Sequence, residues 1–185
     1  MTTIDDVVRR PQRADARRNF DALLAAARDV FAQDGAQGSL EEIARRAGVG
    51  IGTLYRNFAT REDLLEAVYV GEIQALVRVA ESVESAEPWS ALETWLLRFT
   101  EYLRTKRALV EGLNRDSEVM AVCRATMYSA GRPILDRAQA AGVARADISI
   151  EDAVRMLAGV SGAAFDSPEQ RARVLSIAID ALRAR

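Results

Sequence analysis

The sequence contains no histidine and only one cysteine, Cys123, among its 185 residues. Without histidine the chain has no means to build a Ser-His-Asp triad, a histidine general base or a His-ligated zinc site. A single thiol closes no internal disulfide and holds no metal alone, which is typical of proteins from a reducing compartment. We therefore expect neither a metal nor a cofactor. An enzyme would depend on a carboxylate pair among the 27 acidic residues, and no motif singles one out.

Long apolar runs are missing as well. No segment approaches the roughly 20 consecutive apolar residues that a membrane-spanning helix needs. The N-terminal segment MTTIDDVVRRPQRADARRNF also lacks the apolar core of a secretory signal. Because the hydrophobic residues, 49% of the total, are dispersed along the chain, they can fill a sizeable core. The sequence thus predicts a folded, soluble protein of the cytoplasm with no membrane partner.

Net charge is small, at −2, but it is unevenly distributed. Residues 1–61 carry ten arginines against eight acidic residues, a net +2, and the remainder carries 15 basic and 19 acidic residues, a net −4. Arginines gather in a short basic arm around the start of the first expected helix, which fits either a solvated terminus or a nucleic-acid contact. They are Arg9, Arg10, Arg13, Arg17 and Arg18.

Strand signals are absent, whereas apolar residues recur every three or four positions almost throughout the chain. The first expected helix covers 17–33. A capping box formed by Ser39 and Glu42 starts a short second helix, and a third is expected over 50–57. A long fourth helix begins at Thr60 and connects the two halves of the chain.

Further helices are expected in the second half of the chain. Two of them cover 89–104 and 108–113. A long helix follows from Ser117, in which Pro133 removes a backbone donor and predicts a kink beside a cavity. The last two helices begin at capping serines, Ser149 and Ser167.

Two short helices joined by a glycine-containing turn, behind a longer helix, describe a helix-turn-helix unit. Its second helix enters the DNA major groove, so its first residues must let the backbone approach, and its exposed side chains must contact bases or phosphates. Gly50 and Gly52 permit that approach. Leu54 and Phe58 are expected to face the core. The spacing of Ile51 to Leu54 and Phe58 suits the core as well.

The segment SLEEIARRAGVGIGTLYRNFATREDLLEAV resembles the DNA-binding segment of the TetR family of bacterial transcriptional regulators. Ile-Ala, Ala-Gly-Val, Gly-Thr-Leu-Tyr, the phenylalanine three residues later and Glu-x-Leu-Leu fall at the family's spacing. The resemblance implies an all-α fold with an N-terminal three-helix helix-turn-helix DNA-binding domain and a C-terminal helical ligand-binding and dimerisation domain. We therefore expect a basic arm over 1–16, the DNA-binding domain over 17–61 and the regulatory domain over 62–185.

Carried over position by position, the resemblance implies that Ser39 caps the second helix and touches a phosphate, and that Tyr55 places its hydroxyl on the DNA backbone. Thr60 and Arg61 would hold a phosphate at the start of the long helix. The family position of Ile51 faces DNA, where the side chain could meet a thymine methyl, so for Ile51 we favour the groove over the core. The departures from the family are Gly50, where serine is frequent, and Arg61, where lysine is frequent. The candidate DNA-binding residues, with Thr53 and Arg56 facing the groove, are Arg17, Arg18, Ser39, Gly50, Ile51, Gly52, Thr53, Tyr55, Arg56, Asn57, Thr60 and Arg61.

The last two helices carry more small and apolar residues than one buried face needs, so part of them is expected to cover a partner. The resemblance implies a homodimer closed by a four-helix bundle, in which two recognition helices read the halves of a palindromic operator. Alternatively, these helices only close the core of a single chain. The candidate dimer residues are Met156, Val160, Ala163, Val174, Ile177 and Ala178.

Aromatic and methionine side chains recur at helical spacing in the middle helices, which fits either a plain core or a mostly apolar ligand pocket. The family resemblance favours a pocket for a small-molecule effector. Because no arginine or lysine is evidently directed inward to meet an anion, we expect a neutral, largely hydrophobic ligand. The candidate ligand residues are Trp95, Phe99, Tyr102, Met120, Cys123, Met127 and Tyr128.

These features predict a sequence-specific regulator that binds double-stranded DNA. We favour a homodimeric repressor that a ligand releases from its operator by changing the separation of the two recognition helices. One alternative is a regulator without a small-molecule effector, acting as an activator or under the control of a protein partner. Another is a helical dimerisation module with a vestigial helix-turn-helix, against which Arg56, Thr60 and Arg61 argue. An enzyme ranks below all of these.

Overall fold

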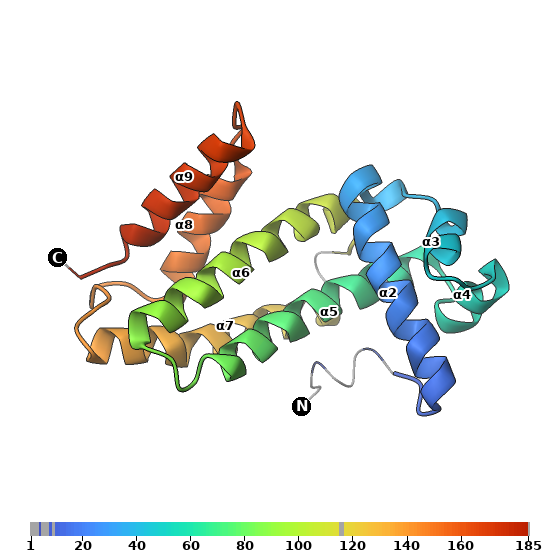
Figure 1. Ribbon diagram of the computed structural model, residues 1–185, viewed down its shortest axis with the longest axis horizontal. Helices are drawn as coiled ribbons and strands as arrows, with labels where there is room; N and C mark the ends of the chain where they lie inside the picture. Colours follow the sequence, from blue (N-terminus) through green and yellow to red (C-terminus); the bar gives the residue numbers. More distant parts are fainter. Residues whose placement is uncertain (1–3, 5–7, 9, 115–116, 185) are drawn as a thin grey trace. The chain divides into compact units, whose positions relative to one another are not determined.

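The computed structural model describes residues 4, 8, 10–114 and 117–184, and within these ranges the regular elements are all helical (Figure 1). The all-α prediction is therefore confirmed. The α-helices are α2 (Ala14–Asp34), α3 (Leu40–Arg46), α4 (Ile51–Asn57), α5 (Arg61–Ser82), α6 (Pro88–Leu109), α7 (Glu118–Ala140), α8 (Ile150–Gly162) and α9 (Pro168–Asp180), with 3-10 turns η1 (Gly35–Gln37) and η2 (Val110–Gly112). In the described part of the chain, no helix combines the length and the apolar character needed to span a bilayer.

Contacts divide the chain into two compact units. The first unit comprises the described residues up to Gln74 together with those of Arg104–Arg124, and the second comprises those of Ala75–Leu103 and of Ala125–Arg185. Helices α5, α6 and α7 each contribute residues to both units. The unit that contains the helix-turn-helix therefore includes the first part of α5.

In the first unit, α2 packs against α3 and α3 packs against α4. The inward stripe of α2 follows the three- and four-residue spacing seen in the sequence, since Phe20, Leu23, Ala27 and Val30 are all buried. Gly48 has a φ of 70° in the turn between α3 and α4, a backbone conformation that glycine adopts at little cost. The turn can therefore close tightly and leave α4 outside the core on one side.

The capping box expected at the start of α3 is only half formed. Ser39 Oγ accepts a hydrogen bond from the Glu42 backbone N–H at 3.2 Å, as expected. The Glu42 carboxylate instead accepts from Arg45 at 2.7 Å and Arg46 at 2.6 Å, which lowers its pKa to about 2. Two guanidinium groups one turn away compete better for this carboxylate than one backbone N–H does.

At the start of α5 both halves of the box are present. The Thr60 N–H donates to Asp63 Oδ2 at 3.0 Å, and the Asp63 N–H donates to Thr60 Oγ1 at 3.1 Å. The predicted start of this helix is thus in place, and its first turn directly follows α4.

The prediction of a separate helix over 108–113 is wrong. Helix α6 runs without interruption from Pro88 to Leu109, and only the 3-10 turn Val110–Gly112 follows it. No glycine or proline interrupts 89–109, so nothing in that stretch ends the helix before the turn. At Gly112 a Cβ would lie 2.5 Å from a Leu65 methyl, so close packing against α5 requires glycine there.

Helix α7 continues through Pro133 to Ala140, so the long helix expected here is present with the proline inside it, and the kink stays a prediction. Proline has no N–H, so the Ser129 carbonyl one turn earlier loses its usual intrahelical donor. On another part of α7, Gly131 lies against the Trp95 ring of α6, where an added Cβ would be 2.5 Å from the indole.

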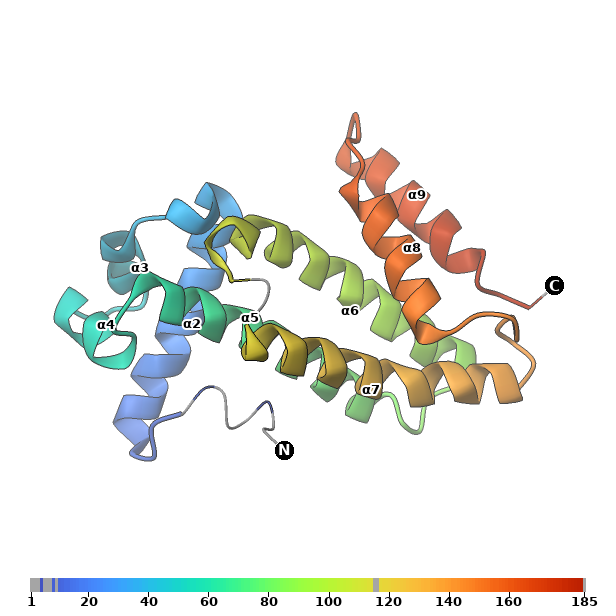
Figure 2. The same cartoon turned by 180° about the vertical axis from the view of Figure 1, so that it is seen from behind.

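Helices α8 and α9 run side by side in the second unit (Figures 1 and 2). The start of α8 has a complete capping box between Ser149 and Asp152. The start of α9 has Ser167 at the cap and Pro168 in the first turn, where the missing N–H costs nothing. Both helix starts agree with the sequence analysis.

Candidate nucleic-acid interface

Helix α4 has one buried and one exposed face. Leu54 and Phe58 are buried, as expected, and Phe58 packs on Phe20 of α2 with ring centroids 5.0 Å apart. Ile51 and Tyr55, by contrast, are 38% and 49% exposed. Two large hydrophobic side chains therefore lie in solvent on a helix of seven residues. Exposed apolar groups of this kind often mark a contact surface.

The two glycines at the start of α4 face empty space. A Cβ added to Gly50 or Gly52 would have no neighbouring heavy atom within 4 Å, and neither residue has a positive φ. A helix-interior glycine costs about 0.5–1 kcal/mol relative to alanine. Gly50 is the N-cap of α4, where glycine is a favoured residue, whereas neither packing nor backbone strain in the described chain explains Gly52.

The polar side chains of α4 are arranged along the same helix. Arg56 Nη2 donates to Thr53 Oγ1 at 2.7 Å, one turn earlier. Asn57 Nδ2 donates to the Thr53 backbone carbonyl at 2.8 Å. Thr53 and Asn57 are half-buried, and Arg56 is exposed. The guanidinium is thus held along the helix with donors left over for an outside acceptor.

The hydroxyl groups of Ser39, before α3, and Thr60, before α5, differ in whether they can still donate a hydrogen bond. Ser39 Oγ accepts from the Glu42 N–H and also donates to Glu41 Oε2 at 3.0 Å. The pKa of Glu41 is lowered, first by a hydrogen bond from its own backbone and then by Ser39. Thr60 Oγ1 accepts from Asp63, so its hydroxyl hydrogen can still be donated to a phosphate.

Arg61 has an intrachain role that the sequence analysis did not anticipate. Its Nη1 donates to the carbonyls of Ala36 at 3.1 Å and Gly38 at 2.5 Å, and the side chain is half-buried. These acceptors are more than twenty residues away in sequence. Arg61 therefore ties the start of α5 to the turn before α3, and only its remaining N–H groups are available to a phosphate.

The arginines of the expected basic arm are partly engaged within the chain. Arg18 forms an ion pair with Asp15, and Arg10 lies 3.3 Å from Asp21. Arg17 is exposed, with its guanidinium 3.5 Å from the Pro11 and Gln12 carbonyls. The predicted first helix begins earlier than expected, at Ala14. Arg9 lies outside the described residues.

The seven residues expected to bind a ligand do not fall in one unit. Met120 and Cys123 are buried in the first unit, where burial and then the nearby Glu66 carboxylate raise the pKa of Cys123 to about 12. The other five belong to the second unit. There the Trp95 and Phe99 rings stack with centroids 6.0 Å apart, and Phe99 lies 5.6 Å from Tyr102. Met127 is also buried, and Tyr128 is half-buried.

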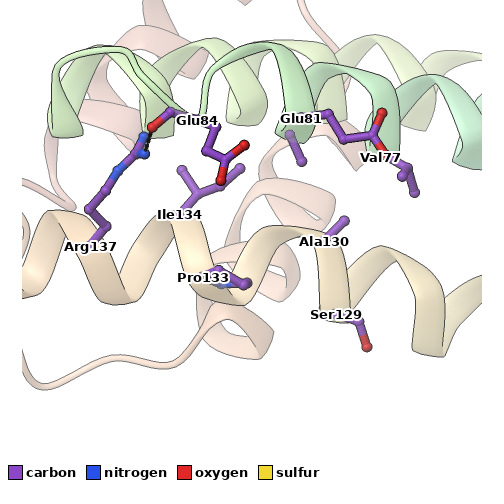
Figure 3. Close-up of a pocket in the computed structure, with 9 residues that line it drawn as sticks. Val77, Glu81, Glu84, Ser129, Ala130, Pro133, Ile134 and Arg137 are labelled. Atoms are coloured by element: carbon purple, nitrogen blue, oxygen red, sulfur yellow. Dashed lines mark hydrogen bonds between the residues drawn. The ribbon is translucent and has the colours of Figure 1, made fainter.

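A cavity of about 330 Å³ lies elsewhere in the second unit, between α5 and α7 (Figure 3). Pro133 lines it, at the position where the sequence predicts a cavity beside a kink. None of the seven expected ligand residues lines it. Three of its lining residues are charged, Glu81, Glu84 and Arg137. The spacing of apolar residues along the helices did not indicate that these charged residues would line a cavity. The lining residues are Val77, Ala80, Glu81, Glu84, Ser129, Ala130, Pro133, Ile134 and Arg137.

The residues expected at a dimer interface differ in exposure. Ile177 of α9 is 68% exposed, more than the other large hydrophobic residues found exposed in the described chain. Gly159 and Gly162 of α8 have open space where a Cβ would be. Of the remaining candidates, Met156, Val160 and Val174 are half-buried, Ala163 is exposed, and Ala178 is already buried within the chain.

No cluster of three or more acidic or cysteine side chains that could hold a metal occurs among the described residues. The surface chemistry of the first unit is instead that of helix α4, with exposed apolar, hydroxyl and guanidinium groups around two glycines. Groups of these kinds are able to contact base edges and phosphates in a major groove.

Comparison with known proteins gives two family matches that together cover most of the chain. Residues 23–68 match the family of bacterial regulatory proteins named after TetR. Residues 87–184, more than half of the chain, match the C-terminal domain of SbtR-like transcriptional regulators, a TetR-type domain. The first match contains α3 and α4, and the second contains α6 to α9.

Two solved structures and one further relative agree with these family matches. A TetR transcriptional regulator from Streptomyces coelicolor is 38% identical, with a TM-score of 0.77 over 89% of this chain and 98% of that one. A TetR regulator from Mycobacterium vanbaalenii is 30% identical, with a TM-score of 0.74 over 94% of this chain and 100% of that one. An HTH-type transcriptional regulator of Staphylococcus aureus is 29% identical over 108 residues, which are 57% of this chain and 56% of the relative's length.

Proteins of this kind are DNA-binding regulators of transcription and not enzymes. The resemblance noted in the sequence is confirmed by the matched domains and by relatives that cover nearly the whole chain. The chain therefore belongs to the TetR family of transcriptional regulators.

Proposed function

We propose that this protein is a homodimeric repressor that binds a palindromic operator and is released from it by a small, largely hydrophobic ligand. The observation that carries the proposal is the outer face of α4, where Gly50 and Gly52 leave space that nothing in the described chain fills. A DNA backbone or base edge fits that space. As a regulator of transcription, the protein acts in the cytoplasm, where bacterial DNA lies.

The exposed side chains of α4 supply complementary contacts. Ile51 can meet a thymine methyl, and Arg56 can donate two hydrogen bonds to a guanine or a phosphate. The Tyr55 hydroxyl donates a hydrogen bond to the DNA backbone, and the Thr60 hydroxyl binds a phosphate near the N-terminus of α5. Since the hydrogen bond to Thr53 already orients Arg56, less side-chain entropy is lost on binding.

A dimer follows from the length of α4. A helix of seven residues reads only a few base pairs, so a second copy is needed for a specific operator. Exposed Ile177 and the open positions at Gly159 and Gly162 support the α8–α9 pair as the dimer surface. Small residues let helices of two chains approach closely, and Ile177 provides apolar area to bury.

The ligand acts from the second unit. Its cavity between α5 and α7 is open to solvent on one side and offers a largely apolar surface. Because α5 also contributes its first part to the DNA-binding unit, a ligand that prefers one position of α5 changes the separation of the two recognition helices. Repression is then relieved when the half-site spacing no longer matches.

The proposal is tested by selecting binding sites from random DNA with the purified protein. We expect a palindromic site whose halves lie about one helical turn apart. Arg56→Ala should weaken binding to that site by about 1–3 kcal/mol and relax the preference at one position in each half. Arg124→Ala, which removes an exposed arginine of α7, is the matched control and should leave the affinity unchanged. Enrichment of no sequence would contradict the proposal.

A further inference from the structure

The cavity of the second unit has a mostly apolar wall. Side chains from α5 and α7 form it, and at about 330 Å³ the space lies at the small end of the roughly 300–1,000 Å³ typical of ligand pockets. A ligand of one ring with short substituents fits such a volume. The apolar lining residues are Val77, Ala80, Ala130, Pro133 and Ile134.

Two carboxylates add negative charge to this wall. Glu81 lines the cavity from α5 and Glu84 from the turn that follows α5, and in Figure 3 the Glu84 side chain extends toward α7. Both residues are exposed. Neither carboxylate has a hydrogen-bond or ion-pair partner in the described part of the chain. Their charge is therefore available to a ligand.

Arg137 offsets only part of this negative charge, because two carboxylates and one guanidinium leave the lining with a net charge of −1. Arg137 directs its guanidinium at the end of α5, where Nη2 donates to the Val83 carbonyl at 2.9 Å and Nη1 donates to the Glu84 carbonyl (Figure 3). These carbonyls lie at the negative end of the helix dipole, so they hold the guanidinium at the backbone and not in an ion pair with either carboxylate. Its buried Nε has no described partner. The lining keeps two carboxylates against one guanidinium that is already engaged.

The α7 side contributes partial negative charge as well. Pro133 deprives the Ser129 carbonyl of its usual donor, and Ser129 itself lines the cavity. A neutral hydrophobic ligand would bring no counter-charge to the two carboxylates. An anion would be repelled by both. A cation with an apolar body matches the lining, because its body contacts the apolar side chains and its charge lies beside the carboxylates.

We propose that this cavity binds a hydrophobic organic monocation, with its apolar body between α5 and α7 and its positive charge beside Glu81 and Glu84. This rests on the proposed function, in which a ligand of the second unit controls DNA binding, and it names the chemical class of that ligand. The effector is then cationic, and not neutral as the sequence alone led us to expect.

The test uses two probes of equal shape and different charge, the phenyltrimethylammonium ion and tert-butylbenzene. Binding of each to the full-length protein, without DNA, is followed by ligand-observed NMR. We expect the cation to bind about tenfold more tightly than its neutral isostere, and the ratio to fall close to one in the double variant Glu81→Gln/Glu84→Gln. Glu111→Gln removes an exposed carboxylate outside the cavity and should keep the full preference. Thermal denaturation checks that every variant is folded.

Equal affinity for the two probes, binding of neither, or an unchanged preference in the double variant would overturn the inference. Operator binding is measured separately by fluorescence anisotropy, with and without the cation. If the cation binds as expected and the operator affinity does not change, the cavity assignment stands and release by ligand is wrong. If operator binding is normal and the charge preference is absent, the inference fails while the DNA-binding proposal stands.

Discussion

Gly52 carries an energetic cost that the folded chain does not recover. It lies in the first turn of α4 with open space around its Cα, where alanine would fit without contact. Arg56 is the opposite case, because its position along the helix is fixed by Thr53 at 2.7 Å. At the scale of single residues, the proposed DNA contact gives Gly52 and Arg56 a role that the stability of the chain does not.

Replacing Gly52 by alanine should therefore separate stability from function. We expect Gly52→Ala to leave the protein as stable as before or to stabilise it by up to about 1 kcal/mol, because alanine favours the helix. Operator affinity should fall at least about tenfold, since the methyl group occupies the space that DNA needs. Urea denaturation and fluorescence anisotropy measure the two effects.

Gly71→Ala is the matched control. Gly71 lies inside α5 and also has open space at its Cβ position. It should gain about 0.5–1 kcal/mol of stability with no change in DNA binding. Loss of operator affinity in Gly71→Ala as well, or its retention in Gly52→Ala, would contradict the assignment of Gly52 to the interface.

The burial of Cys123 predicts slow thiol chemistry and a pH effect. Its pKa is raised from 9.0 to about 12, mainly by burial, so the folded protein keeps the thiol protonated where the unfolded chain loses its proton. Stability contributed by this group should therefore fall as the pH rises from about 9 toward 12. We expect a thiol-reactive dye to label Cys123 at pH 8 only after denaturant is added. Rapid labelling of the native protein would show that this region opens.

At the scale of elements, local signals fixed the helix starts and distant contacts fixed much of the rest. Ser149 and Ser167 predict the starts of α8 and α9, because a capping side chain bonds a backbone N–H only two or three residues later. The link from Arg61 to Ala36 and Gly38 spans more than twenty residues, so no local pattern reveals it. For the same reason the sequence predicts a cavity near Pro133 but not the carboxylates of Glu81 and Glu84 that line it.

The fit between α6 and α7 depends on one glycine. In Gly131→Ala the new methyl would lie within 2.5–2.9 Å of three atoms of the Trp95 ring, which is too rigid to give way. We expect a loss of about 1–3 kcal/mol, the usual effect of overpacking a core. Thermal denaturation followed by tryptophan fluorescence should show a midpoint lowered by roughly 2–4 °C for each kcal/mol lost.

A second substitution checks the cause. In the background Trp95→Phe the smaller ring leaves room, so the added effect of Gly131→Ala should shrink by at least about half. If Gly131→Ala is equally harmful in both backgrounds, contact with the indole is not the reason for glycine at this position.

At the scale of the whole molecule, the account requires two copies of the chain on one operator. The surface proposed for this contact contains Ile177, which is 68% exposed, on a helix pair whose glycines at 159 and 162 have open space. A dimer would bury this apolar area, and each monomer would then contribute one α4. The charges support a division of labour, since residues 1–61 carry a net +2 and the rest a net −4.

Ile177→Asp should break the dimer, because a carboxylate would be placed in an apolar contact without a partner. We expect light scattering after size-exclusion chromatography to give the mass of one chain, and operator affinity to fall by at least about tenfold at nanomolar protein. Leu97→Asp is the control, since Leu97 is 48% exposed on α6, outside the α8–α9 pair. A dimer that survives Ile177→Asp would place the interface elsewhere.

The most direct measurement is fluorescence anisotropy of the protein with DNA from its own upstream region and with a scrambled duplex, at several salt concentrations. Phosphate contacts alone give equal affinities and a steep salt dependence for both duplexes. The account predicts a preference for one sequence that persists as salt is raised and is weakened by about 1–3 kcal/mol in Arg56→Ala. If the protein does not prefer the upstream duplex over the scrambled one, the measurement is repeated with the operator selected from random DNA. Equal binding of that selected duplex and its scrambled form, or no loss in Arg56→Ala, would contradict the claim that α4 reads a DNA sequence.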